Sequence, residues 1–125
     1  MKKVLVIEDN DNNMELITFI LEANHYETIR AETGQKGIDL AIKDIPDFIL
    51  LDIQLPDIMG TDVLKIIRKH KACDSIPIIA ITSYAMAGDR ENLLNAGCDG
   101  YIEKPIDPMI VMDQIENVIQ LRSQS

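Results

Sequence analysis

The segment Phe-Ile-Leu-Leu-Asp at residues 48–52 decides the fold, because four apolar residues in succession end in a single carboxylate. A short run that is apolar throughout is typical of a strand buried on both faces of a parallel sheet. Pro46 stands before this run, and residues 60–69 beyond it have the apolar spacing of an amphipathic helix that begins at Gly60. The stretch therefore predicts one strand followed by one helix.

The same strand–helix unit recurs on both sides of this segment, which gives five units in series. The predicted strands are Val4–Ile7, Tyr26–Ala31, Phe48–Leu51, Pro77–Ile81 and Gly100–Ile102. The predicted helices are residues 11–23, Gly34–Lys43, Gly60–Lys69, Ala85–Asn95 and Asp107–Leu121. Because such units pair in parallel through right-handed crossovers, the sequence predicts an α/β chain, a doubly wound (βα)5 sheet with helices on both faces.

Local signals support several of these boundaries. Thr33 is the expected N-cap of the second helix, and Gly97 is the expected stop of the fourth. The apolar spacing also predicts which residues of the first and last helices face the sheet. They are Leu16, Ile17, Ile20 and Leu21 in the first helix and Ile110, Val111, Ile115, Val118 and Ile119 in the last.

The composition limits both the architecture and the partners. A chain of 125 residues fits one domain and can bury a core without disulfides, so Cys73 and Cys98 are expected to be reduced thiols. The net charge of −9 argues against binding to nucleic acid or to an anionic membrane. Since no stretch has the length of a membrane span or the form of a signal peptide, we expect a soluble, cytoplasmic protein.

Polar side chains follow four of the five predicted strands. Glu8 and Asp9 follow the first strand, Asp52 ends the third, Thr82 and Ser83 follow the fourth, and Lys104 follows the fifth. Because the carboxyl ends of parallel strands meet at one edge of the sheet, we expect these side chains to lie close together. An acid at the end of a strand is more often a helix cap or a solvated loop residue than a ligand, so the hypothesis depends on these residues occurring together.

This group of residues has the chemistry of a site that binds both a cation and an anion. Three adjacent carboxylates repel one another, and a hard cation bound through oxygen relieves that repulsion. Mg²⁺ suits an acidic site open to water because it keeps several of its own water ligands. Lys104 and Thr82 add a positive charge and a hydroxyl donor, which together suit a phosphoryl group. The residues alone leave the reaction open.

The motifs around these residues resemble the receiver domain of two-component response regulators, and among them the small single-domain cell-cycle regulators of the DivK type. The resemblance extends in register over nearly the whole chain. The residues that carry it are Val-Ile-Glu-Asp-Asn at 6–10, Leu-Leu-Asp-Ile-Gln-Leu-Pro at 50–56, Gly60, Ile-Thr-Ser-Tyr-Ala-Met at 81–86, Gly-Cys-Asp-Gly-Tyr at 97–101 and Glu-Lys-Pro at 103–105.

The resemblance implies a role for each site residue. Asp52 is implied as the phosphoacceptor, and Glu8, Asp9, Asp52 and the backbone carbonyl of Gln54 are implied as ligands of Mg²⁺ or Mn²⁺. Glu8 stands where many receivers carry aspartate, but both side chains offer oxygen ligands. Thr82 and Tyr101 resemble the switch residues of the family, Lys104 resembles the lysine that pairs with the phosphoryl group, and Lys104–Pro105 resembles its cis peptide bond.

The resemblance also implies the fold and the function. The fold is a flavodoxin-like, CheY-like sheet with the strand order 2-1-3-4-5. Residues 1–121 are expected to form the receiver domain and residues 122–125 a short polar tail, without an output domain. The domain is then a signalling switch that catalyses only its own phosphorylation and dephosphorylation. Its phosphoryl donor would be a histidine kinase or a histidine phosphotransfer protein, and its signal would pass to a downstream protein.

Three other functions remain open at this stage. A phosphatase of the haloacid-dehalogenase type needs a second aspartate two residues after its nucleophile, where this chain has Gln54. A flavin or nucleotide binder of the same strand order needs a glycine-rich loop after the first strand, where this chain has the acidic segment Glu-Asp-Asn-Asp-Asn at residues 8–12. A degenerate receiver that only binds partners would lack site residues, but all of those implied by the resemblance are present.

Two aromatic residues have two interpretations each. Phe19 lies off the main apolar face of the first helix, so it either packs at the rim of the core or docks a histidine phosphotransfer protein. Tyr84 follows Thr82 by two positions. It either packs on the fourth helix or, together with Gln54, slows the access of water to a phosphorylated Asp52.

Overall fold

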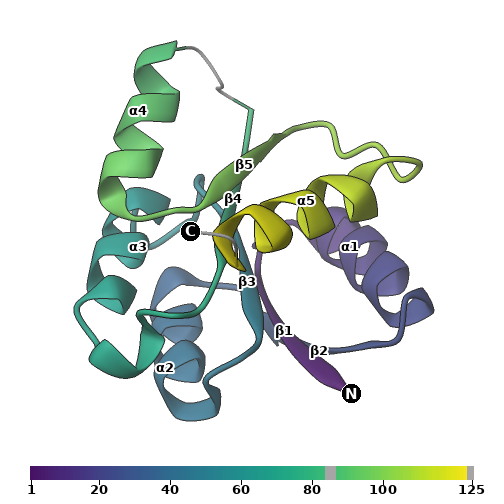
Figure 1. The fold of residues 1–125 in the computed structure, drawn as a ribbon, viewed down its shortest axis with the longest axis horizontal. Helices are drawn as coiled ribbons and strands as arrows, with labels where there is room; N and C mark the ends of the chain where they lie inside the picture. Colours follow the sequence, from purple (N-terminus) through teal and green to yellow (C-terminus); the bar gives the residue numbers. More distant parts are fainter. Residues whose placement is uncertain (84–86, 124–125) are drawn as a thin grey trace.

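A computed structural model of the chain describes residues 1–83 and 87–123. Its centre is a sheet of five parallel strands in the order β2-β1-β3-β4-β5 (Figure 1), which confirms the predicted fold and strand order. The strands are β1 Lys2–Ile7, β2 Tyr26–Ala31, β3 Phe48–Asp52, β4 Ile78–Thr82 and β5 Gly100–Glu103.

Helices cover both faces of this sheet. They are α1 Asp11–Ala23, α2 Gly34–Asp44, α3 Gly60–Arg68, α4 Ala87–Ala96 and α5 Val111–Ser123, with a short 3-10 turn at Lys71–Cys73. Figure 1 shows α1 and α5 on one side of the sheet and α2, α3 and α4 on the other. In the described ranges 1–83 and 87–123, no helix is both long enough and apolar enough to cross a membrane.

The alternation of side chains along the strands builds two hydrophobic cores, one on each face. Leu5 and Leu51 point into the core beneath α2, α3 and α4, whereas Val6 and Leu50 point into the core beneath α1 and α5. Every residue of β3 is buried, as its uninterrupted apolar run predicts. Each large apolar side chain buried in this way stabilises the fold by about 1.5–3 kcal/mol. Cys73 and Cys98 lie in the first core as free thiols.

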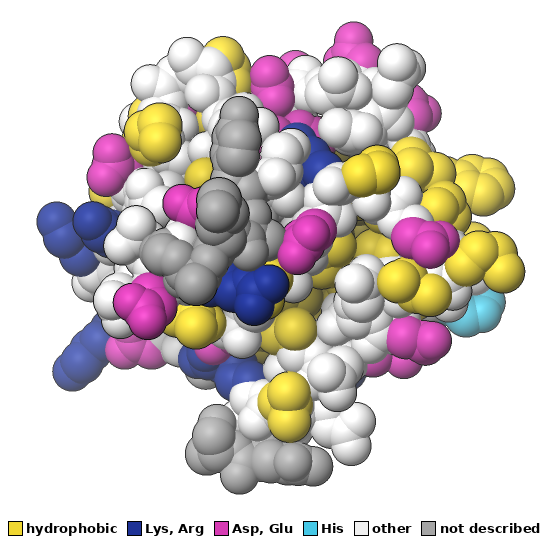
Figure 2. Space-filling model, turned by 90° about the horizontal axis from the view of Figure 1, so that it is seen from above, with side chains coloured by type: hydrophobic (Ala, Val, Ile, Leu, Met, Phe, Trp, Pro, Cys, Tyr) yellow, Lys and Arg dark blue, Asp and Glu magenta, His cyan; other side chains and the backbone are white. Residues whose placement is uncertain are grey.

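The carboxyl edge of the sheet faces the viewer in Figure 2, where acidic side chains lie around its centre. Hydrophobic side chains gather on the right of that view, where Figure 1 places α1 and α5. Three large apolar side chains of α1 and of the segment before α5 are exposed, Phe19 at 73%, Met109 at 87% and Ile110 at 46%. At 73% exposure, the side chain of Phe19 does not pack at the rim of the core.

The start of α5 differs from the prediction. The helix was expected to begin at Asp107 but begins at Val111, because residues 108–110 form a turn. The carboxylate of Asp107 accepts a hydrogen bond from the N–H of Met109 at 2.9 Å, and its carbonyl accepts one from the N–H of Val111 at 3.0 Å, so Asp107 caps this turn rather than starting the helix itself. Ile110 therefore lies on the surface, so its expected place on the inward face was wrong, while Val111 and Ile115 are buried as predicted.

An ionic cluster around Asp99 ties several elements together at the amino edge of the sheet. Oδ2 of Asp99 accepts hydrogen bonds from Arg68 at 2.9 Å and from the N–H of Ile78 at 2.8 Å. Oδ1 of Asp99 pairs with Arg122 of α5. Arg68 also donates to the carbonyl of Gly97 at 2.9 Å. Gly97 ends α4 at a φ of +116°, as expected for a glycine stop. This cluster, called here the Asp99 clamp, joins α3, α4, α5 and β4.

Candidate functional site

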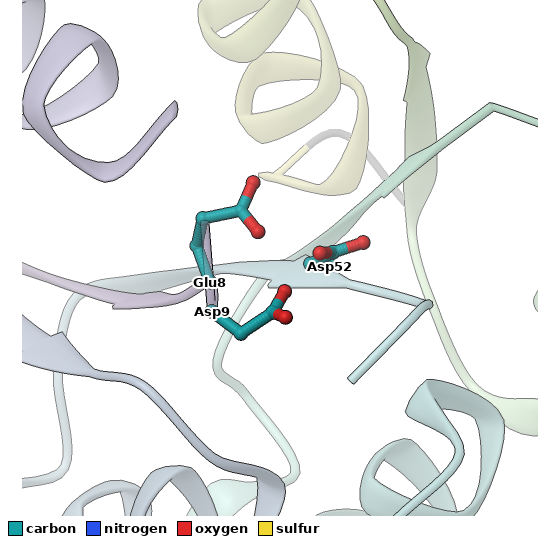
Figure 3. Close-up of side chains that lie close together, drawn as sticks. All are labelled: Glu8, Asp9 and Asp52. Atoms are coloured by element: carbon teal, nitrogen blue, oxygen red, sulfur yellow. The ribbon is translucent and has the colours of Figure 1, made fainter. Parts of the chain in front are cut away.

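Three carboxylates meet where β1 and β3 end at the carboxyl edge of the sheet. The strands pair with Ile7 opposite Leu51, so the residues that follow, Glu8 and Asp52, reach the edge side by side. Asp9 comes next along the chain, and Figure 3 shows its side chain directed toward Asp52. Each residue of the three has a carboxylate oxygen within 4.8 Å of such oxygens on the other two. Glu8 and Asp52 are buried, and Asp9 is exposed.

Glu8 is the most constrained of the three acids. Its backbone N–H donates to the carbonyl of Ala31 at 2.9 Å, which extends the pairing of β1 with β2. Its Oε2 accepts a long hydrogen bond from the N–H of Asn10 at 3.4 Å. Its Oε1 is buried and, within residues 1–83 and 87–123, accepts no hydrogen bond. Burial of the carboxyl and its proximity to Asp52 raise the pKa of Glu8 to about 7.

One oxygen of Asp52, Oδ1, contacts both Lys104 and the loop that follows β3. The ammonium nitrogen of Lys104 lies 3.2 Å from Oδ1 of Asp52 and 3.7 Å from Oε1 of Glu8. The N–H of Gln54 donates to Oδ1 of Asp52 at 3.0 Å. The backbone N–H of Lys104 donates to the carbonyl of Thr82 at 2.8 Å, and the Lys104–Pro105 peptide bond is cis. One cation thus faces two buried carboxylates.

Thr82 and Tyr101 lie on the two strands beyond Asp52. Thr82 ends β4 and is 2% exposed, and β3 pairs with β4 so that Asp52 lies opposite Ile81. Tyr101 lies on β5 and is half-buried. The guanidinium carbon of Arg90 lies 5.2 Å from the centroid of the Tyr101 ring, in the geometry of a cation–π contact. Thr82 is thus on the strand next to the acids, and Tyr101 is one strand further away.

The loop from residue 53 to residue 59 closes back onto the end of β3. The N–H of Gly60 donates to the carbonyl of Ile53 at 2.9 Å. A Cβ atom at Gly60 would lie 2.4 Å from Cα of Ile53 and 2.9 Å from the carbonyl oxygen of Asp52. Only glycine permits this approach, so Gly60 determines how closely α3 begins beside the acidic cluster.

The residues at this edge fit a divalent cation with a preference for oxygen ligands. Without a cation, two buried carboxylates and one exposed carboxylate have only Lys104 to balance their charge, and Oε1 of Glu8 has no hydrogen-bond donor in the described part of the chain. A cation would balance this charge and give that oxygen a partner. The cluster includes the three acidic side chains predicted as metal ligands.

The structure therefore brings together most of the residues that the sequence predicts for the site. Glu8, Asp9, Asp52, Lys104 and the backbone of Gln54 form one cluster. Tyr84 lies outside the described residues. Sequence reasoning missed Asp57, which contacts the start of α2, and Arg90, which contacts the ring of Tyr101. No spacing in the sequence signals those contacts, because each joins residues of different elements.

Comparison with known proteins identifies the family. The sequence profile described as "Response regulator receiver domain" matches residues 4–116. The polar-differentiation response regulator DivK of Brucella ovis is 42% identical over 118 residues, which cover 94% of this chain and 96% of the relative. DivK of Brucella anthropi has the same identity and coverage.

Solved structures agree with this assignment. A CheY-like receiver domain protein from Methanospirillum hungatei superposes with a TM-score of 0.89 at 29% identity, covering 99% of this chain and 98% of that chain. The receiver domain of a sensor histidine kinase from Pseudomonas aeruginosa superposes with a TM-score of 0.86 at 31% identity, covering 95% and 98%. The latter structure holds a magnesium ion coordinated in its active site cleft. From its fold, its sequence and its similarity to these proteins, the chain belongs to the response regulator receiver domain family.

Proposed function

We propose that Asp52 accepts a phosphoryl group from a phosphohistidine of a histidine kinase or of a histidine phosphotransfer protein. The observation that carries this proposal is the position of Asp52, buried between Lys104 and two further carboxylates at the carboxyl edge of the sheet. A carboxylate in such a position can act as a nucleophile when neighbouring positive charge stabilises the oxygens of the phosphoryl group. Residues 1–121 would form the domain that carries out this transfer, and Arg122 and Ser123 of α5 would belong to it, so the tail expected at residues 122–125 would begin only after Ser123.

The transfer replaces one bond to phosphorus with another. An oxygen of Asp52 forms a P–O bond as the P–N bond of the phosphohistidine breaks, and the electron pair of that bond returns to the imidazole nitrogen. Lys104, 3.2 Å from Oδ1 of Asp52, is placed to pair with the oxygens of the transferred group. In a second, separate step, water attacks phosphorus, the bond between phosphorus and the Asp52 oxygen breaks, and inorganic phosphate leaves as the carboxylate of Asp52 is regenerated. These two steps are the only reactions that the proposal assigns to the domain.

Glu8, Asp9, Asp52 and the backbone carbonyl of Gln54 would hold Mg²⁺ or Mn²⁺ at this site. When bound, the cation supplies positive charge that balances the carboxylates and the oxygens of the phosphoryl group. The residues themselves orient that charge, because Glu8 and Asp52 are fixed at the ends of paired strands. The raised pKa of Glu8 means that the metal-free site holds part of its population in the protonated state near neutral pH.

Phosphorylation of Asp52 would then change the surface of the domain through Thr82 and Tyr101. Thr82 lies on the neighbouring strand, where a hydroxyl can move toward a phosphoryl oxygen. Tyr101 is half-buried and would turn inward into the space that Thr82 vacates. The surface formed by α4, β5 and α5 would thereby change its affinity for a downstream protein.

The partners that fit this proposal are proteins. The exposed Phe19 of α1 offers an apolar contact to a histidine phosphotransfer protein or a kinase. The net charge of −9 disfavours nucleic acid and anionic membranes as partners. The two free cysteines suit a reducing compartment, so we place the protein in the cytoplasm.

Phosphorylation by acetyl phosphate tests the proposal directly. Wild-type protein with MgCl₂ should gain the mass of one phosphoryl group, and Asp52→Asn should gain none. Asp11→Asn is a matched control, because Asp11 is an exposed acid of α1 close in sequence to the cluster but outside it. The proposal fails if wild-type protein stays unmodified, or if Asp52→Asn is modified as fast as the wild type.

A further inference from the structure

Asp57 connects the loop after β3 to the beginning of α2. Its Oδ1 accepts a hydrogen bond from the N–H of Gly34 at 2.7 Å, and its Oδ2 accepts one from the N–H of Gln35 at 3.0 Å. Both donors lie in the first turn of α2, where N–H groups have no partner within the helix. The carboxylate thus caps a helix from 23 residues further along the chain.

The same helix also has an N-cap residue directly before it in the chain, which can be compared with Asp57. Thr33 precedes α2, and its hydroxyl oxygen accepts from the N–H of Lys36 at 3.2 Å. This confirms Thr33 as the predicted N-cap. Thr33 and Asp57 therefore satisfy different N–H groups of the same first turn. Thr33 acts within its own segment, whereas Asp57 brings the β3–α3 loop against α2.

The contact between loop and helix is close and charge-assisted. A Cβ atom at Gly34 would lie 2.9 Å from Cγ2 of Val63 and 3.2 Å from Oδ1 of Asp57, so α2 lies directly against the loop and α3. The hydrogen bonds from Gln35 and Gly34 lower the pKa of Asp57, which keeps its carboxylate ionised. An ionised carboxylate at a helix N-terminus also interacts favourably with the helix dipole.

The loop that Asp57 holds is the one that carries Gln54. Two hydrogen bonds restrain the loop from within. The N–H of Gln54 donates to Oδ1 of Asp52 at 3.0 Å, and the N–H of Gly60 donates to the carbonyl of Ile53 at 2.9 Å. Both restraints are local to β3 and its loop. Among the hydrogen bonds of the described residues, those of Asp57 join the middle of this loop to α2, on a different part of the chain, and Ile58 of the loop also lies against Gly34.

We propose that Asp57 is a positioning residue of the metal site. By holding the β3–α3 loop against α2, it keeps the backbone carbonyl of Gln54 where a divalent cation can use it, although Asp57 itself does not belong to the acidic cluster. This inference rests on the proposed function, since it requires that Glu8, Asp9, Asp52 and Gln54 bind the cation. It predicts that the affinity for the cation depends on a contact at the start of α2.

The dependence must also hold in the opposite direction. If the Asp57 contact favours cation binding, then cation binding stabilises the Asp57 contact by the same free energy. The amide protons of Gly34 and Gln35 should therefore exchange with solvent more slowly when Mg²⁺ is bound. The amide of Lys36, which is capped by Thr33, serves as the internal reference and should change less.

The test compares Mg²⁺ dissociation constants measured by calorimetric titration of the full chain. We expect Asp57→Ala to weaken Mg²⁺ binding about fivefold, at the lower end of typical coupling between sites. Asp57→Asn keeps one carbonyl oxygen as acceptor and should give an intermediate value. Thr33→Ala, which removes the other cap of the same helix, should lower the stability of the protein but leave the Mg²⁺ affinity unchanged.

The outcomes separate this inference from the function on which it rests. If wild-type protein binds Mg²⁺ and Asp57→Ala binds it equally well, the inference is overturned and the proposed function stands. If Asp57→Ala and Thr33→Ala weaken binding equally, the effect belongs to the stability of α2, and the inference is again overturned. If wild-type protein binds no Mg²⁺, both fail. Should Asp57→Ala not fold, the exchange of Gly34 and Gln35 in wild-type protein decides the matter, and rates unaffected by Mg²⁺ contradict the inference.

Discussion

The side-chain nitrogen of Lys104 lies 3.2 Å from Oδ1 of Asp52. The same nitrogen lies 3.7 Å from Oε1 of Glu8, and both carboxylates are 1% exposed. Two buried negative charges thus depend on one positive charge at the rim of the site. This relationship makes the metal-free site a region of unbalanced charge, and the first three predictions follow from it.

Replacement of Lys104 by methionine should destabilise the metal-free protein. Removal of one partner from a buried ion pair leaves uncompensated charge, and the loss should be about 2–3 kcal/mol because the ammonium group is partly exposed. Denaturation by urea in the presence of a chelator measures this loss. MgCl₂ should restore part of it, and Lys104→Arg should behave nearly as wild type. A methionine variant as stable as the wild type in chelator would contradict the assigned charge balance.

Replacement of Asp52 by asparagine should have the opposite effect on stability. It removes one of three mutually repelling carboxylates while Glu8 keeps its interaction with Lys104, so the metal-free protein should gain about 1 kcal/mol. The same variant should lose most of the stabilisation that wild-type protein gains from MgCl₂. Thermal unfolding with and without MgCl₂ measures both effects. A lower unfolding temperature for Asp52→Asn in chelator would show that the carboxylates do not repel one another as the geometry implies.

The ionisation of Glu8 should make the stability of the metal-free protein depend on pH. Its pKa is raised from 4.5 to about 7 in the folded protein, so folding favours the protonated form. This contribution is fully present below pH 4.5 and is lost as the pH rises through 7. Between pH 5 and pH 8 the wild type should therefore lose more than about 1 kcal/mol relative to Glu8→Gln, which cannot ionise. Parallel pH dependences in chelator would contradict the assignment.

The exposed ring of Phe19 predicts a defect in phosphotransfer between proteins. Phe19→Ser should slow phosphoryl transfer from a phosphorylated partner about tenfold, as expected when an apolar anchor is removed from an interface. Phosphorylation by acetyl phosphate should stay unchanged, because the small donor needs no docking surface. Leu94→Ser is a matched control, since Leu94 is an exposed apolar residue of α4, on the opposite side of the sheet. Equal transfer rates for Phe19→Ser and wild type would remove the docking role.

The close approach at Gly60 predicts that a single methyl group disturbs the site. In Gly60→Ala the new Cβ would lie 2.4 Å from the backbone of Ile53, so the loop or α3 must shift, at about 1–3 kcal/mol. Mg²⁺ binding should weaken as well, because the displaced loop carries Gln54. Gly100→Ala is the control, since its Cβ would lie 2.6 Å from the side chain of Val118, at the amino end of β5 and so at the opposite edge of the sheet. If both variants bound Mg²⁺ alike, Gly60 would have no special role at the site.

Much of this fold follows from local sequence patterns. The α1 helix begins and ends where its spacing predicts. The side chain of Asn10 caps its first turn by accepting a hydrogen bond from the N–H of Asn13, and Asn24 is its C-cap residue. Burial within that helix was less predictable. Thr18 is buried, since its hydroxyl donates to the carbonyl of Met14 at 2.7 Å and so needs no contact with water. A polar residue satisfied by its own helix gives no hydrophobic signal.

The site shows the same limit of sequence reasoning. Glu8, Asp9 and Asp52 could be grouped because parallel strands end at a common edge, a rule that requires only the order of elements. Asp57 could not be linked to Gly34 in this way, because loops have no fixed periodicity. The turn at residues 108–110, which Asp107 caps through the N–H of Met109, delays the start of α5 without any mark in the apolar spacing. Contacts of this kind depend on three-dimensional proximity that the spacing of residues does not encode.

The Asp99 clamp lies at the opposite edge of the sheet from the proposed phosphoacceptor, Asp52. Asp99 joins Arg68 and Arg122 at the amino ends of the strands, while Asp52 stands at the carboxyl end of β3. The ion pairs that anchor the helices and the carboxylate that carries the signal thus lie at opposite edges of the same sheet. The charge at Asp52 can therefore change repeatedly while the contacts of Asp99 continue to hold α3, α5 and β4 together at the other edge.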